Sequence, residues 1–379
     1  MTTIDASRWK ESLATLVNIN SHTFNKQGVD QVSDCFTAWM DSLGFEAEYF
    51  PRQHIGDHVL YRAPHSDFST HPQKVLLLGH ADTVFAPNTF EGFREDDQWV
   101  YGPGVCDMKG GLVVAYEALR QLSEANGNTL NHIDFLLVSD EETGSDDSKH
   151  LSAKLAQDYE VCFVFEAAGE RGEVVTGRKG VGTFTATIQG KGAHAGVRYA
   201  EGINANLEAA IKTQKLSELM DLSKGTTVNV GKMQGGIGAN TVSPEASLLF
   251  EIRYTQLAEK NRVLTGMQAI IEQSFVAGTH CTLSGDIQRD VMEPSDAQQR
   301  LLTTLNHING SPLLTEFRGG VSDANIVSAA GVATLDGFGP FGDGDHTVHE
   351  RASKQSFVER IQLMHDLLAY HQQYGRLYE

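Results

Sequence analysis

Apolar residues three or four positions apart dominate several stretches in the N-terminal third of the chain. This spacing predicts helices over about 9–17, 29–43 and 112–122, and Gly44 is placed to stop the second of them. The stretch over 112–122 has the length expected of a helix that crosses over between two strands.

Short, uninterrupted apolar runs lie between these helices. They occupy 75–78, 133–138 and 161–165, with Asp134 as an exception near the start of the second run. Runs of this length that alternate with helical patterns are typical of strands buried in a parallel sheet. The pattern therefore predicts an α/β fold with a mostly parallel sheet flanked by helices.

The pattern changes near Val181. The stretch 183–188 alternates polar and apolar residues, as expected for a strand with one wet face. A helix, two strands, a helix and a strand are expected next, over about 203–222, 226–233, 246–254, 257–275 and 281–287. This β-α-β-β-α-β order is that of a ferredoxin-like α+β domain.

The α/β pattern returns after this segment. It predicts a helix from about Ser295, another after Gly320, a strand at 332–335 and a terminal helix that carries Phe357, Ile361, Met364 and Leu368. We therefore expect one α/β domain, formed by 1–177 and 291–379, that is interrupted by a smaller domain at 178–290.

Size and composition agree with this organisation. A chain of 379 residues with 40% hydrophobic residues suits one large globular domain plus a smaller one. The formal charge of -19 argues against nucleic acid as a partner, because a nucleic-acid binder needs clustered basic residues.

Three further features of the sequence indicate the cellular compartment of the protein. We see no secretory leader in the first residues and no apolar stretch near the ~18 residues that span a bilayer, so no membrane partner is expected. The four cysteines are far apart and form no CxxC pair, which is typical of reduced thiols. We expect a cytoplasmic protein.

The ends of the predicted strands carry the candidate chemistry. In open α/β sheets, ligands bind beyond the carboxyl ends of the strands. Four such ends, and one loop just before a helix, deliver histidines or carboxylates: His80 and Asp82 after 75–78, Glu141 and Glu142 after 133–138, Glu166 after 161–165, His346 after 332–335, and Asp107 in the loop.

This set of side chains fits a pair of metal ions. Two histidines with three or more carboxylates suit Zn²⁺ first, with Co²⁺ or Mn²⁺ as alternatives. A carboxylate can bridge two ions about 3.5–4 Å apart. Asp82 lies two residues after His80 and can fix the orientation of its ring. The adjacent Glu141 and Glu142 diverge, so one can hold metal while the other acts as a general base.

Seven segments resemble the M20 metallopeptidases, and among them the glutamate carboxypeptidase-like branch. In chain order they are GHADTV, GPGVCDMKGGL, VSDEETGS, VFEAAGE, GKGAHAG, GANTVSPEA and GDGDHTVHE. The resemblance covers nearly the whole chain. It implies a zinc-exopeptidase-like catalytic domain and, at 178–290, a lid and dimerisation domain that would pair two subunits in a homodimer.

The resemblance also implies a metal-binding role for five residues. His80 and Glu166 would bind one zinc ion, Glu142 and His346 would bind the other, and Asp107 would bridge them. It thus implies two Zn²⁺ per subunit.

Other residues would act on the substrate. By the same resemblance, Glu141 would be the base that activates water. Asp82 belongs to the catalytic residues through the His80 ring that it orients. His194 would reach into the partner subunit's site and steady the oxyanion. Asn240 and Arg253 would help to hold the substrate's carboxylate, and the loop 319–323 would line the same pocket.

Each assignment has a simpler alternative. His349 competes with His346, but in the family the ligand is followed by a hydroxyl residue and, four positions on, by Glu; Thr347 and Glu350 place His346 in that pattern. Cys106 could suggest a thiol nucleophile, but no base and orienting partner accompany it. The alternatives for the remaining residues are a surface role for Arg253 and a turn-forming role for Asn240.

We expect a dizinc metallohydrolase that cleaves an amide bond next to a free carboxylate. The favoured activity is that of a carboxypeptidase that releases a C-terminal, acidic residue from a small peptide. The alternative is an N-acyl-amino-acid deacylase of the acetylornithine deacetylase or desuccinylase type, which uses the same machinery. A third option, a catalytically inactive metal-binding dimer, is disfavoured by the complete ligand set and Glu141.

Overall fold

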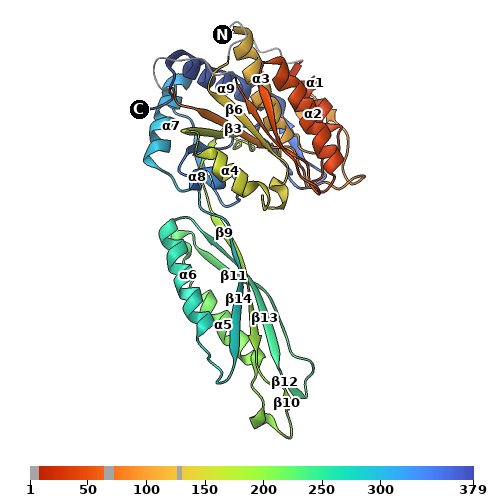
Figure 1. Ribbon diagram of the computed structural model, residues 1–379, viewed down its shortest axis with the longest axis vertical. Helices are drawn as coiled ribbons and strands as arrows, with labels where there is room; N and C mark the ends of the chain where they lie inside the picture. The colour runs from red at the N-terminus through yellow and green to blue at the C-terminus, as the bar shows by residue number, and fades with distance from the viewer. Residues whose placement is uncertain (1–7, 64–71, 126–129) are drawn as a thin grey trace. The chain divides into compact units, whose positions relative to one another are not determined.

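The computed structural model describes residues 8–63, 72–125 and 130–379. The chain divides into two compact units (Figure 1). The first unit comprises Met1–Gly177, Pro294–Arg318 and Ser322–Glu379, and the second comprises Arg178–Glu293 and Gly319–Val321.

A six-stranded sheet forms the centre of the first unit. Its order is β1-β2-β6-β3-β7-β16, with bounds Glu46–Phe50, His58–Arg62, Ile133–Val138, Val75–His80, Val161–Val164 and Ala333–Leu335. The neighbours from β6 to β16 are parallel, whereas β1 and β2 add an antiparallel edge. Every residue of β3, β6 and β7 is buried, which explains their uninterrupted apolar runs. The mixed α/β class with a mostly parallel sheet is thus confirmed.

Helices flank this sheet. They are α1 (Arg8–Val17), α2 (Lys26–Ser42), α3 (Lys109–Ala125), α4 (Ser148–Ala156), α7 (Asp296–Asn309), α8 (Asp323–Ala329) and α9 (Lys354–Tyr374). Helix α3 packs against α1 and α9, whereas α4 packs against α8. The ring of Trp9 stacks on that of Phe357 with 4.2 Å between centroids, which joins the first helix to the last.

Smaller strands carry the loops around the sheet. A four-stranded sheet has the order β17-β18-β5-β4, with bounds Gly342–Asp343, Arg351–Ser353, Trp99–Tyr101 and Arg94–Glu95. Strand β8 (Val174–Arg178) pairs with β15 (Thr315–Arg318). The short 3₁₀ helix η1 (Glu141–Thr143) directly follows the loop after β6.

The second unit is a four-stranded antiparallel sheet with two helices. The strand order is β11-β13-β9-β14, with bounds Thr227–Gly235, Glu245–Tyr254, Gly180–Gln189 and His280–Arg289. Helices α5 (Ala205–Ser217) and α6 (Leu257–Glu272) complete the β-α-β-β-α-β order, so the ferredoxin-like expectation is confirmed. The two-residue strands β10 (Ala193–His194) and β12 (Thr241–Val242) pair with each other.

The predicted helix over 203–222 is too long at its C-terminal end. Helix α5 ends at Ser217, although Leu222 continues the apolar spacing. The reason is local: the Asp221 side chain accepts a hydrogen bond from the Ser223 amide and starts a new turn, which leaves Leu222 exposed.

Among the described residues, no helix is long and apolar enough to cross a membrane.

A buried lysine joins the two helices of the second unit. The fully buried Lys212 ammonium donates to the carbonyl oxygens of Ile270, Ile271 and Gln273 at the end of α6. It also lies 3.0 Å from the carboxylate of Glu208, which is itself fully buried. This arrangement explains where α6 ends, because the lysine satisfies its last carbonyl groups.

Replacing Lys212 with Met should destabilise the second unit by about 3–5 kcal/mol, because it leaves the buried Glu208 carboxylate with the amides of Phe275 and Val276 but without its cation. Lys215 on the same helix is partly exposed and pairs with Glu218, so Lys215→Met should cost less than about 0.5 kcal/mol. Urea unfolding combined with hydrogen exchange of α5 and α6 measures both. Equal stability of the two variants would contradict the expectation.

Candidate metal centre

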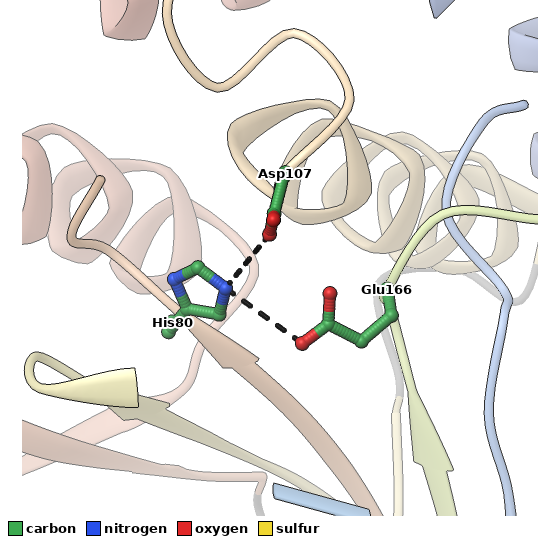
Figure 2. A group of neighbouring side chains, drawn as sticks. All are labelled: His80, Asp107 and Glu166. Atoms are coloured by element: carbon green, nitrogen blue, oxygen red, sulfur yellow. Dashed lines mark hydrogen bonds and ion pairs between the residues drawn. The ribbon is translucent and has the colours of Figure 1, made fainter. Parts of the chain in front are cut away.

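Five side chains of the first unit gather into two overlapping groups. His80 ends β3, Glu166 lies two residues beyond β7, and Asp107 lies in the loop before α3; together they form the first group (Figure 2). The second group consists of Asp107, Glu142 of η1 and His346, in the loop between β17 and β18. Within each group, the potential ligand atoms lie within 4.8 Å of one another.

Asp107 belongs to both groups. Its Oδ1 lies 3.2 Å from Nε2 of His80, and its Oδ2 lies 3.1 Å from Nε2 of His346. The remaining carboxylates stand beside these rings: Glu166 Oε1 is 3.7 Å from His80 Nε2, and Glu142 Oε2 is 3.1 Å from His346 Nε2. The two oxygens of one carboxylate therefore face two separate sites.

Electrostatic forces in this cluster are strong. Burial, followed by the charge of Asp107, raises the pKa of Glu142 to about 8 and that of Glu166 well above its usual range. Hydrogen bonds to Asp107 and Glu142 raise the pKa of His346 to about 11. Against the effect of burial, hydrogen bonds from His346 and His80 lower the pKa of Asp107.

These shifts show a set of groups that compete for protons. Three carboxylates in one buried place repel one another unless protons or cations lie between them. Imidazole nitrogens and carboxylate oxygens are also the ligands that Zn²⁺ takes. The donor set thus fits a pair of divalent metal ions that would replace the shared protons.

Asp82 connects the elements that present these candidate ligands. Its carboxylate lies 3.3 Å from Nδ1 of His80 and accepts hydrogen bonds from the amides of Glu141 (3.3 Å) and Glu142 (3.2 Å). The Nδ1 atom of His80 is also 3.0 Å from the Asp82 carbonyl oxygen, so this end of the ring is occupied and Nε2 faces Asp107.

The hydroxyl of Thr23 completes the set around Asp82, donating to its carboxylate at 2.6 Å. Thr23 was not predicted from the sequence, because a lone threonine after a helix gives no local signal of a partner fifty-nine positions away. Glu141 begins η1, is buried, and stands directly beside Glu142.

The alternatives raised by the sequence can be compared with the geometry. His346, and not His349, faces Asp107 and Glu142 in the described chain. His346 adopts a left-handed backbone conformation with φ 61°, which is uncommon outside glycine and recurs at functional sites. Burial raises the pKa of the Cys106 thiol well above its usual range, which opposes a role as a thiolate nucleophile.

His194, Asn240 and Arg253 belong to the second unit, whereas the five clustered residues belong to the first. His194 and Asn240 are neighbours, because His194 pairs with Thr241 across β10 and β12 and the Ala195 amide donates to the Asn240 carbonyl oxygen. The Arg253 guanidinium donates to the Glu251 carboxylate and to the Gly319 carbonyl oxygen, at 2.7 and 2.9 Å. These pairings of Arg253 were not predicted from the sequence.

Comparison with known proteins identifies the family. The model of peptidase family M20/M25/M40 matches residues 76–370. The chain belongs to this family. As an M20 protein it is a hydrolase of the metallopeptidase class, and the resemblance of its seven motifs is confirmed.

Its M20 relatives differ in substrate. Carboxypeptidase G2 of Pseudomonas sp. (strain RS-16) is 25% identical over 348 residues, 89% of this chain and 82% of that protein. Succinyl-diaminopimelate desuccinylase of Xylella fastidiosa (strain 9a5c) is also 25% identical, over 364 residues, 88% of this chain and 92% of that protein.

Solved structures share the M20 fold. The aminopeptidase PepT of Bacillus cereus ATCC 10987 has a TM-score of 0.77 at 21% identity and covers 97% of this chain and 99% of its own. The YXEP protein of Bacillus subtilis, described as a dinuclear metal binding peptidase, has a TM-score of 0.69 at 12% identity and covers 96% and 98%.

The shared carboxylate makes a specific prediction about metal content. If Asp107 contributes to both sites, Asp107→Ala should lose both metals, whereas His80→Ala should keep the one held by Glu142 and His346. The exposed Asp343, which pairs with Arg351, is the control, and Asp343→Asn should keep two. Metal analysis after dialysis against metal-free buffer checks all three. Two metals in Asp107→Ala would show that the sites are independent of it.

Proposed function

We propose that this protein is a dizinc carboxypeptidase that releases a C-terminal, acidic residue from a small peptide. The supporting observation is that Asp107 faces His80 and His346 with its two oxygens, each within 3.2 Å. His80 and Glu166 would hold one ion and Glu142 and His346 the other. Two Zn²⁺ ions in such a site lower the pKa of water towards ~7 and polarise the scissile carbonyl.

Glu141 is the proposed general base. Its neighbour Glu142 would be a ligand, and the Asp82 carboxylate holds the amides of both residues, so base and ligand are placed by one group. Glu141 would accept the proton of the attacking water and return it to the leaving amine.

Arg253 and Asn240 are the proposed anchors of the substrate carboxylate. Arginine has five N–H donors, and three hydrogen bonds tie those of Arg253 to Glu251 and Gly319, which leaves two N–H groups for a substrate. The pairing with Glu251 orients the guanidinium and offsets part of its charge. The loop at 319–323 would line the same pocket.

Deacylation of N-acyl amino acids is the second candidate. It is favoured by the 25% identity with a desuccinylase over 88% of this chain, which equals the identity with carboxypeptidase G2. Both reactions cleave an amide next to a free carboxylate and differ on the acyl side. An inactive metal-binding dimer is disfavoured because the ligand set and Glu141 are all present.

A matched substrate panel tests the proposal. The zinc-loaded protein should release glutamate from peptides and folyl-type amides faster than it hydrolyses N-acetyl or N-succinyl amino acids. Amidation of the terminal carboxylate should abolish release, since the anchor is lost. Chromatography of the released amino acid measures each rate. Faster hydrolysis of N-succinyl substrates would assign the protein to the deacylases instead.

Glu141→Gln is the internal control for this panel. It should keep both metals yet lose about 10³ or more in turnover, because the proton acceptor is removed. The exposed Glu170 lies on the same unit, and Glu170→Gln should keep wild-type rates. Turnover of Glu141→Gln near the wild-type rate would show that another group is the base.

We propose further that the protein is a cytoplasmic homodimer joined through the second unit. All four cysteines are free, which supports a reducing compartment. By the family resemblance, His194 of one subunit would steady the oxyanion in the partner's site, and its exposed position on β10 leaves it accessible.

Subunit mixing tests the role of His194. His194→Ala and Glu141→Gln homodimers should each be inactive, whereas a heterodimer of the two should regain one working site of two. That site combines Glu141 from one subunit with His194 from the other. Activity of heterodimers isolated with two affinity tags is the measurement, and no recovery would show that His194 does not act across an interface.

A further inference from the structure

One carboxylate organises the backbone of the loop that carries Asp107. Oε1 of Glu350 accepts hydrogen bonds from the amides of Cys106 (2.9 Å) and Asp107 (3.0 Å), and its Oε2 accepts one from the amide of Gly104 (3.0 Å). The Glu350 side chain is buried, with 1% exposure, and has no ion-pair partner in the described part of the chain. Its two oxygens are therefore met by backbone amides.

This arrangement answers a local problem of the loop. Residues 102–107 lie between β5 and α3 and form neither helix nor strand, so their amides lack partners in regular structure. Buried amides without acceptors are costly, and a carboxylate that accepts three of them makes charge-assisted bonds. Glu350 thereby fixes the path of the loop up to the residue that faces both sites.

Glu350 also connects two ligand-bearing segments. It follows His346 by four residues and begins the return to β18, which pairs with β5. The Gly102 amide donates to the Glu350 carbonyl oxygen at 3.5 Å, so backbone and side chain both contact the Asp107 loop. The same two segments meet again where His346 Nε2 lies 3.1 Å from Asp107 Oδ2.

We propose that Glu350 is a positioning residue that sets the placement of Asp107 between the two metal sites. It contacts neither metal nor substrate and acts through the three amides. This inference rests on the proposed metal pair. In the sequence, Glu350 served only to favour His346 over His349 as a ligand. The role proposed here concerns the Asp107 loop.

A residue that only supports folding would give a different result from one that positions Asp107. Glu350→Gln keeps the shape of the side chain, but its NH₂ group would face the Gly104 amide, so one bond and the charge are lost. Asp134 is the matched control: it is buried in the first unit and accepts from the Ala63 amide and the Tyr159 hydroxyl, near the start of β6 and away from the ligands.

The experiment compares metal affinity with the stability of the metal-free protein. In chelator competition with Zn²⁺, Glu350→Gln in the full chain should bind about 10- to 100-fold more weakly than wild type, the usual effect of losing support behind a ligand. Asp134→Asn should lose stability in thermal unfolding yet keep wild-type affinity. Zinc affinity of Glu350→Gln within about twofold of wild type would overturn the inference.

A second variant covers the case in which Glu350→Gln does not fold. Glu350→Asp keeps the charge but withdraws it by one methylene, so it should fold and still bind Zn²⁺ about tenfold more weakly. Unchanged zinc affinity in this variant would also overturn the inference. If the wild type itself binds fewer than two ions, the proposed function fails before any variant is compared.

Discussion

Mutual repulsion of three closely spaced carboxylates is the constraint that the candidate metal centre has to meet. Asp107, Glu142 and Glu166 come from a loop, a 3₁₀ helix and the segment just beyond a strand, and their side chains are mostly shielded from solvent, with 19%, 4% and 11% exposure. Histidines on either side of Asp107 partly offset this repulsion. Divalent cations in such a site would remove an unfavourable energy as well as making new bonds.

The fold tolerates this concentration of charge because two other carboxylates hold the backbone of the segments that carry the clustered residues. Asp82 fixes the His80 ring and two amides of η1, while Glu350 fixes three amides before α3. Each supporting carboxylate is satisfied by N–H and O–H donors. The protein thus places two further carboxyl groups next to the cluster, and their oxygens bind backbone amides and a hydroxyl.

The sequence predicted those parts whose physics is local. Strands β3, β6 and β7 are buried throughout, so their composition alone revealed them. The carboxyl ends of these parallel strands meet, which is why histidines and carboxylates after them were expected to lie together. The choice of Glu142 over Glu141 as a ligand came from the family resemblance and stays a prediction. The contacts of Thr23 with Asp82 and of Arg253 with Glu251 depend on side chains brought together by the fold, and no periodicity encodes them. The early end of α5 was missed because the Asp221 turn competes with an apolar spacing that continues through Leu222.

The order of the strands in the central sheet has a consequence for biosynthesis. Strand β16 pairs with β7, yet the two lie on opposite sides of the second unit in the chain, and the same separation divides His346 from His80 and Asp107. A ribosome must therefore complete the entire intervening unit before the edge of the sheet can close. Until then the nascent first unit exposes β7 as an unpaired edge and presents an incomplete ring of ligands. The first candidate group, His80, Asp107 and Glu166, is thus synthesised before the second unit, whereas the second group waits for His346, which follows that unit.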